Sequence, residues 1–217
     1  QQLNSVFMAM ETGWVMFFEA QRIPSTDYPT DSCFPDPITK IMDDERKAYF
    51  SSGESHFESD YYATLYWMQP NDHEGRLRAF VVEGKKQKGL TKEDYLTTFS
   101  NVVEEVYKAF FACQIPCEIL SADEMVTYLY STISMNRRTL RLPKHPLLLD
   151  QFLCDSALSG GLEPRLGRKH MRVVTIIGYM DNTIFGIFDG LNLQNFSYRW
   201  ISRYYCLSKL DALDAVS

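Results

Sequence analysis

The alternation of aromatic, strand-like segments with helical stripes constrains the fold of this chain more than any other feature. Residues Trp14 to Arg22 are aromatic and β-branched and are bounded by Gly13 and Pro24, which predicts a strand. Residues Ser55 to Met68 form a longer, alternating segment and predict a second strand. One face of that strand should carry Phe57, Tyr61, Ala63, Leu65 and Trp67. The chain therefore has to build a sheet.

Three later segments are expected to complete the sheet. They are a short strand at Pro116 to Leu120, a buried-type strand at Arg172 to Tyr179 and a last strand at Phe196 to Leu207. Strand alternation places Tyr198, Trp200 and Tyr204 on one face of the last strand and Arg199, Ile201 and Arg203 on the other. We expect its rings to face the core and its arginines to face a polar or interface side.

Helices are predicted between these strands. Apolar residues at helical spacing indicate a first helix that stops near Gly13: Leu3, Val6, Phe7 and Met10. Asp36 and Pro37 supply an N-cap and a first helical position, so a second helix should run from there to Gly53. Its stripe comprises Ile38, Ile41, Met42, Ala48 and Tyr49.

Two capping boxes start further helices. Thr91 with Asp94 begins a helix of roughly six turns, and Ser121 with Glu124 begins the next. The first of these has an apolar face of Tyr95, Phe99, Val102, Val103, Val106 and Phe110, and the second one of Met125, Leu129 and Ile133. Short helices are expected at Leu147 to Cys154 and Phe185 to Leu193.

These elements predict a mixed α+β fold with helices packed on a roughly five-stranded, largely antiparallel sheet. It would form a single compact domain or two small lobes. Residues 71–89 mix Gly, Lys and Asp around one apolar patch and are expected to form a mobile loop or small flap.

Bulk composition narrows the functional classes. A net charge of −6 over 217 residues argues against a protein that coats nucleic acid through overall basicity. Five scattered cysteines fit reduced thiols in the cytoplasm better than a disulfide scaffold. No apolar run approaches the roughly 20 residues that span a bilayer, so we expect any membrane contact to be peripheral.

The sequence contains no motif typical of a catalytic site. A P-loop requires G-x-x-x-x-G-K-[ST], and the nearest imitation, Gly161 to His170, has five residues between its glycines and no hydroxyl after Lys169. Cys113 and Cys117 lack a second pair at zinc-finger spacing and are expected to pack as small apolar residues. No nucleophile elbow occurs. We expect no catalytic, cofactor-binding or metal-binding residue here, and thus no enzyme.

Two basic clusters remain, one in a loop at residues 137–144 and one at residues 165–172. Each is either a solvated surface or a contact for anionic lipid headgroups, DNA or an acidic patch on a partner. With the two arginines of the last strand they define a candidate interaction surface: Arg137, Arg138, Arg141, Lys144, Arg165, Arg168, Lys169, Arg199 and Arg203.

Several ordered stretches resemble the N-terminal domain of the TrbE/CagE-type conjugal-transfer and type IV secretion ATPases, and TrbE-like proteins most of all. The stretches are Gly13 to Val15 with Gln21 to Pro24, Phe34 to Thr39 with Asp43 to Arg46, His56 to Trp67, Ser159 to Pro164, His170 to Val174, and Tyr198 to Trp200. Their order and spacing agree with the family along essentially the whole chain.

The resemblance implies that residues 1–207 form the non-motor domain and that 208–217 begin the connection to a C-terminal ATPase domain. ATP and Mg²⁺ would be used by that domain, in a hexamer that energises substrate transfer and pilus assembly. The expected role is docking to inner-membrane secretion subunits and neighbouring ATPase subunits, in the cytoplasm at the bacterial inner membrane.

The alternative is a nucleic-acid-binding module that uses clusters 137–144 and 165–172. An enzyme with a spatially assembled site is a third reading.

Overall fold

The computed structural model describes residues 2–8, 10, 12–25, 28–29, 33–51, 56–68, 91–178, 182, 184–208 and 213. The loop expected at 71–89, the cap expected at Gly53 and nearly all of segment 208–217 lie outside these residues. The chain divides into two units, each described below by itself. Unit 1 comprises Gln1–Ile115 with Gly186–Ser217, and unit 2 comprises Pro116–Phe185.

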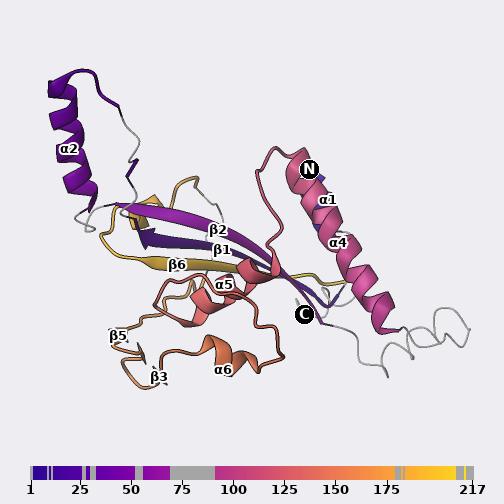
Figure 1. The fold of residues 1–217 in the computed structure, drawn as a ribbon. Coiled ribbons are helices and arrows are strands. Elements are labelled where there is room, and N and C mark those ends of the chain that lie inside the picture. Colours follow the sequence, from indigo (N-terminus) through magenta and orange to yellow (C-terminus); the bar gives the residue numbers. More distant parts are fainter. Residues whose placement is uncertain are drawn as a thin grey trace, which may run out of the picture. The chain divides into compact units, whose positions relative to one another are not determined.

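Unit 1 contains an antiparallel three-stranded sheet in the order β2-β1-β6 (Figure 1). Its strands are β1 (Trp14–Pro24), β2 (Phe57–Trp67) and β6 (Tyr198–Tyr205). Trp14 lies opposite Trp67, while Met16 lies opposite both Leu65 and Tyr204. The three most aromatic strand predictions are therefore confirmed, and the strand nearest the N-terminus is the central one.

Two helices, α1 (Gln2–Met8) and α4 (Lys92–Ala112), pack on one face of this sheet. The buried residues of this core are Met10, Trp14, Met16 and Val106. The Trp14 ring stacks on Trp67 at 5.1 Å and on Phe99 at 5.5 Å between ring centroids. The capping box of α4 forms as predicted, because Thr91 accepts from the Asp94 amide and the Asp94 carboxylate accepts from the Thr91 amide.

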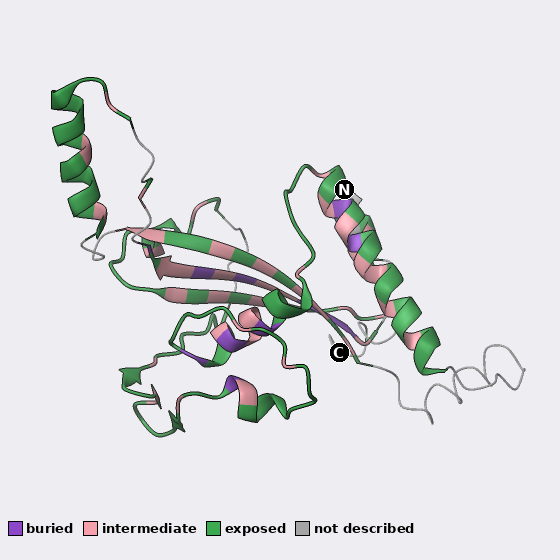
Figure 2. Cartoon of the chain, viewed as in Figure 1, coloured by how far each residue is buried: buried purple, intermediate pink, exposed green. Residues whose placement is uncertain are grey.

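The helix predicted after Pro37 is present as α2 (Pro37–Ser51), but its stripe is not part of a core. Ile38, Ile41 and Met42 are 67%, 60% and 64% exposed, and none of the described residues of α2 is buried (Figure 2). Asp36 caps the helix by accepting from the Thr39 amide at 3.2 Å. The sequence periodicity predicted the helix correctly, but an apolar stripe does not say which surface it meets.

Unit 2 contains α5 (Ala122–Ile133), α6 (Leu149–Leu153) and a small antiparallel sheet. The sheet has the order β3-β4-β5, formed by Leu158–Ser159, Arg165–Leu166 and Lys169–His170. The buried core of unit 2 lies between its helices and consists of Val126, Tyr130 and Leu153. The predicted face of α5 is confirmed only at Leu129, which packs against this core; Met125 is 52% exposed, and the buried residues of the helix are Val126 and Tyr130.

Three other predictions are wrong. Pro116 to Leu120 and the described part of Arg172 to Tyr179 form no strand. Both segments are exposed along nearly their whole length, and neither pairs with a described strand. A composition with high β propensity is therefore not sufficient to form the backbone hydrogen bonds of a sheet. Phe185 to Leu193 forms turns around the short 3₁₀ helix η1 (Asp189–Leu191) rather than an α-helix.

The mixed α+β class with antiparallel sheets and packed helices is confirmed. The strands form two three-stranded sheets, so the predicted single sheet of about five strands was approximate. Among the helices of the described residues, none combines the length and apolarity needed to cross a bilayer.

Candidate functional site

The first basic cluster lies in a loop that is fastened to α5. The Leu140 amide donates to the Thr127 hydroxyl at 3.0 Å, and the Leu142 amide donates to the Asp123 carboxylate at 2.8 Å. Leu140 also packs against the core of unit 2. These contacts fix the backbone of the loop, so its charged side chains project from an ordered segment.

Asp155 joins the start of the same loop to α5. Its carboxylate accepts from the Tyr130 hydroxyl, from Ser134 at 3.0 Å and from the Asn136 side chain at 2.8 Å. The hydrogen bond from Tyr130, together with those from Asn136 and Ser134, holds the pKa of Asp155 well below its usual range. Neither hydrophobic periodicity nor a motif predicted this carboxylate as a hub.

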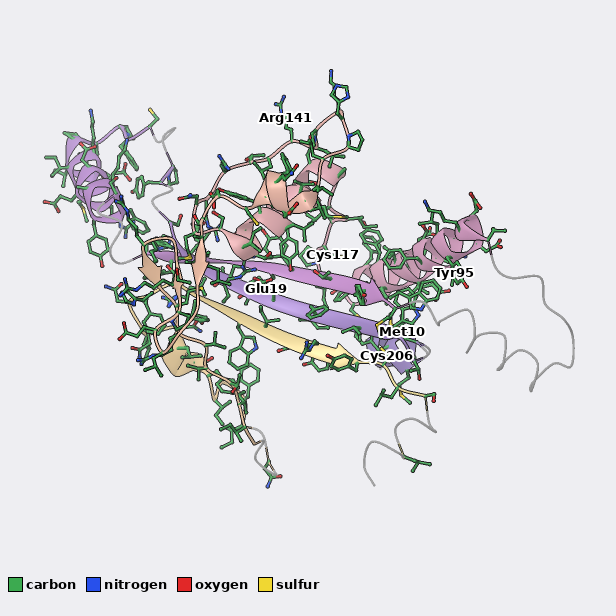
Figure 3. The ribbon with its side chains drawn as sticks, turned by 90° about the horizontal axis from the view of Figure 1, so that it is seen from below. Met10, Glu19, Tyr95, Cys117, Arg141 and Cys206 are labelled. Atoms are coloured by element: carbon green, nitrogen blue, oxygen red, sulfur yellow. The ribbon has the colours of Figure 1, made fainter. Side chains whose placement is uncertain are left out.

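The cations of this loop fall into two groups. Arg138 lies 4.0 Å from the Asp155 carboxylate and 4.8 Å from the centre of the Tyr130 ring, so it belongs to the hub. Arg137, Arg141 and Lys144 are exposed. Figure 3 shows the Arg141 side chain projecting away from the ribbon. Arg138 thus has a structural role, while Arg141 and Lys144 present their charge outward.

The second cluster lies on the β4–β5 hairpin. Arg165 and His170 sit 4.0 Å and 3.5 Å from the Glu163 carboxylate, which partly offsets the local positive charge. Arg168 occupies the hairpin turn beside Gly167, whose φ of 59° suits glycine, and both Arg168 and Lys169 are exposed. Arg168 and Lys169 are therefore the cations of this cluster that present their charge to solvent, whereas Arg165 shares Glu163 with His170.

The two arginines of β6 belong to unit 1 and differ in environment. Arg199 pairs with Glu19 of β1, a carboxylate whose side chain is only 3% exposed. Arg203 is exposed, with its guanidinium 5.1 Å from the Tyr205 ring centre. Of the nine candidate residues, seven lie in unit 2 and two in unit 1. Arg199 contributes to the sheet through an ion pair with a buried carboxylate, which the sequence did not reveal.

Another arginine of unit 1, Arg22, organises the turn before β6. It donates to the Gln194 carbonyl at 3.0 Å and to the Leu191 carbonyl at 3.4 Å, and its guanidinium lies 4.2 Å from the Phe57 ring centre. In the sequence this residue stands out only within the Gln21 to Pro24 stretch of the resemblance. Its contacts hold the 186–194 turn against the end of β1.

An open hollow of about 540 Å³ lies beside α2, lined by Tyr28, Pro29, Asp43, Arg46 and Phe50. The Tyr28 hydroxyl donates to the Asp43 carboxylate, and this hydrogen bond raises the pKa of Tyr28. Phe50 packs against Tyr28 and His56, at 5.5 Å and 4.6 Å between ring centroids. These contacts attach the Phe50 side of α2 to the chain and leave the Ile41 side exposed.

Metal and thiol chemistry find little support among the residues that the structure describes. No group of three or more His, Cys, Asp or Glu side chains there could hold a metal ion. All five cysteines are free thiols. Burial raises the pKa of Cys206. Cys113 is half-buried but Cys117 is exposed, so the expected apolar packing of Cys117 was wrong.

Comparisons with known proteins identify related sequences. Residues 1–75 match the family model described as type IV secretion system ATPase VirB4/TrbE, N-terminal domain. The conjugal transfer protein TrbE of Rhizobium radiobacter is 29% identical over 98% of this chain, and the chain spans 28% of that relative's length. No solved structure matches the chain.

Two proteins of Sinorhizobium fredii, named as successive portions of a probable conjugal transfer protein TrbE, match shorter stretches. The first portion is 46% identical over 27% of this chain and 41% of its own length. The second portion is 31% identical over 42% of this chain and 13% of its own length. The resemblance found in the sequence is confirmed by these matches.

Proposed function

This chain carries a VirB4/TrbE-type N-terminal domain of a type IV secretion ATPase, and from that premise we propose that it works as a docking and assembly domain. It binds inner-membrane secretion subunits and neighbouring ATPase subunits, at the cytoplasmic side of the inner membrane. The domain itself performs no catalysis. It positions a motor that energises substrate transfer and pilus assembly.

The observation that carries this proposal is the exposed apolar stripe of α2. Ile38, Ile41 and Met42 project from a helix with no buried residue among those described, although the helix is capped and held through Phe50. The apolar face of such an ordered amphipathic helix is in contact with water, so a partner that covers this face would be bound favourably through burial of apolar area. The helix also lies within the residues that match the family domain.

Nucleotide binding and hydrolysis then belong to the motor domain of the parent protein. No G-x-x-x-x-G-K-[ST] motif occurs in the chain, so phosphate cradling by a P-loop has no residues here to perform it. ATP and Mg²⁺ would be bound by the motor domain of the parent, assembled as a hexamer. The three curated relatives are named as conjugal transfer proteins, which supports a role in conjugation.

A pull-down of inner-membrane secretion subunits tests the docking role. The 217-residue chain should retain at least one such subunit, and Ile41→Ala with Met42→Ala should weaken that binding by roughly 30- to 150-fold, because about 2–3 kcal/mol of apolar contact is lost. Alanine keeps the helix intact, since it is the best helix former.

The matched control is Lys40→Ala with Lys47→Ala, on another face of the same helix. Retention should be nearly unchanged in this variant. If the motor domain alone carries all of the binding, or if the two double variants lose binding equally, the docking role of α2 is wrong.

The nucleic-acid alternative stays a prediction. It requires salt-dependent retention of single- or double-stranded DNA. Arg138 is a poor residue for that test because it belongs to the Asp155 hub. Arg141→Glu with Lys144→Glu is the better variant, and absence of retention at low salt eliminates the alternative.

A further inference from the structure

We propose that residues 135–149 of unit 2, here called the cation–leucine loop, form a contact site for a bilayer surface rich in anionic phospholipid. The segment contains Arg137, Arg138, Arg141 and Lys144 and no Asp or Glu. It also contains leucines and a methionine that are exposed: Met135, Leu142, Leu147, Leu148 and Leu149. The inference deepens the proposed membrane-peripheral role, on which it rests, by naming the residues and the lipid class.

The loop is built so that its two sides differ. On the inner side, Leu140 packs in the core, and Arg138 and Asn136 engage the Asp155 hub. On the outer side, Arg141 and Lys144 are exposed and have no ion pair with any described residue. Because the loop backbone is already fixed on its inner side, binding through Arg141 and Lys144 would lose little backbone conformational entropy.

The outer apolar residues supply the second element of a membrane contact. Leu142, Leu147 and Leu148 are 53%, 55% and 65% exposed, and they flank Lys144 along the chain. Cations beside exposed aliphatic side chains suit the headgroup region of a bilayer, where charge meets phosphate and leucine reaches the acyl boundary. Neither element alone gives stable membrane binding, whereas two together do.

The composition of the loop favours a bilayer over nucleic acid. Residues 135–149 contain no Phe, Tyr or Trp, so they lack the large aromatic rings on which successive bases stack. The exposed leucines would bury little apolar area against the charged phosphate backbone of a nucleic acid. The β4–β5 hairpin, in contrast, keeps Glu163 among its cations.

The charge distribution supports the same partner. Residues 116–185 hold eight Lys and Arg against seven Asp and Glu, whereas the rest of the chain holds 14 against 21. An anionic surface would repel the acidic remainder and attract this loop. Charge complementarity therefore points to one local contact rather than a general basic coating.

Vesicle sedimentation with the 217-residue chain tests the inference without any secretion subunit present, so its outcome is separate from that of the docking test. Vesicles of phosphatidylcholine with about 30% phosphatidylglycerol should bind the chain, and pure phosphatidylcholine should not. Arg141→Glu with Lys144→Glu should weaken binding at least about 25-fold, because each cation near an anionic surface is worth roughly fivefold. Leu142→Ser with Leu147→Ser should weaken it roughly tenfold.

The matched control is Arg168→Glu with Lys169→Glu, which makes the same charge change on the hairpin. This control should keep most of the vesicle binding, and hydrogen exchange should slow in residues 135–149 when vesicles are added. Circular dichroism checks folding, and Arg141→Ala with Lys144→Ala replaces any charge variant that fails to fold.

Three results overturn the inference. One is no binding of the wild-type chain to the anionic vesicles. Another is an equal loss in the hairpin control, which would reflect net charge alone. The third is unchanged vesicle binding in the leucine variant together with tight binding to a DNA duplex, which would point to a phosphate-backbone site instead.

Discussion

The two units of this chain are stabilised in different ways. In unit 1, β1 packs between two long strands, and Trp14 lies in a stack with Trp67 and Phe99 beneath α4. In unit 2, a small buried core of Val126, Tyr130 and Leu153 is supplemented by the polar hub of Asp155. Unit 1 therefore depends on apolar burial between distant segments, whereas unit 2 combines a smaller apolar core with hydrogen bonds to the Asp155 carboxylate.

The difference makes the two units separable in an experiment. All three tryptophans, Trp14, Trp67 and Trp200, belong to the sheet of unit 1. Tryptophan fluorescence consequently reports only on unit 1, while hydrogen exchange in α5 reports on unit 2. Each of the following predictions uses one or both probes.

The largest effect is expected for Trp14→Ala. Trp14 is 5% exposed and contacts two other rings, so the substitution should lower the free energy of unfolding of unit 1 by about 3–5 kcal/mol. Urea unfolding followed by the fluorescence of the remaining tryptophans measures the loss. Tyr61→Ala, at a site 78% exposed on β2, is the control and should cost less than about 1 kcal/mol. Equal losses would contradict an apolar core centred on Trp14.

The next effect concerns the ion pair between β1 and β6. Arg199→Met removes the guanidinium from the buried Glu19 carboxylate and should cost about 2–3 kcal/mol, since Arg199 is itself partly exposed to solvent. Denaturant unfolding of the single variant and of Glu19→Gln with Arg199→Met gives the comparison. The double variant should recover much of the loss. No recovery would mean that the pair is not the source of the effect.

A pH effect is expected in unit 2 and not in the tryptophan signal. The pKa of Asp155 is lowered in the folded chain, so the unfolded chain takes up a proton first as pH falls below about 4. The contribution of the Asp155 hub is therefore complete above that pH and is lost progressively below it. Protection factors of the α5 amides should fall in this range, and Asp155→Asn should remove the pH dependence. An unchanged profile in that variant would exclude the hub as its cause.

The smallest effects come from the helix caps. Thr91→Ala and Ser121→Ala each remove one side of a capping box and should cost about 1 kcal/mol in α4 and α5. Only Thr91→Ala should shift the tryptophan transition if the two units unfold separately. A shift of that transition by Ser121→Ala would show that they unfold together.

Sequence patterns predicted the local elements well where chemistry acts over a few residues. The two capping boxes and the start of α2 at Pro37 form as expected, because their partners lie three residues away. Strand pairing depends on distant residues, which explains the failure at Arg172 to Tyr179. That segment has strong β propensity, yet Val173 and Val174 are 79% and 85% exposed without a ladder.

The candidate surface was predicted incompletely. The clustering of basic residues in the sequence identified the candidate residues, and the structure shows that Arg141 and Lys144 are exposed. The clustering could not separate them from Arg138 and Arg199, whose acidic partners lie 17 and 180 residues away in sequence. Pairing at such separations leaves no local pattern.

The position of β1 in the sheet has a consequence for synthesis on the ribosome. β1 is made first, gains β2 by residue 67, and can receive β6 only when residue 205 has emerged. At typical translation rates this interval of roughly 140 residues lasts from several seconds to about half a minute. During that time the β6 side of β1 is open, and unit 2 emerges and can fold while unit 1 waits for its last strand. A nascent chain of this kind is most exposed to mispairing in mid-synthesis, and a chaperone that shields one strand edge would serve it best then.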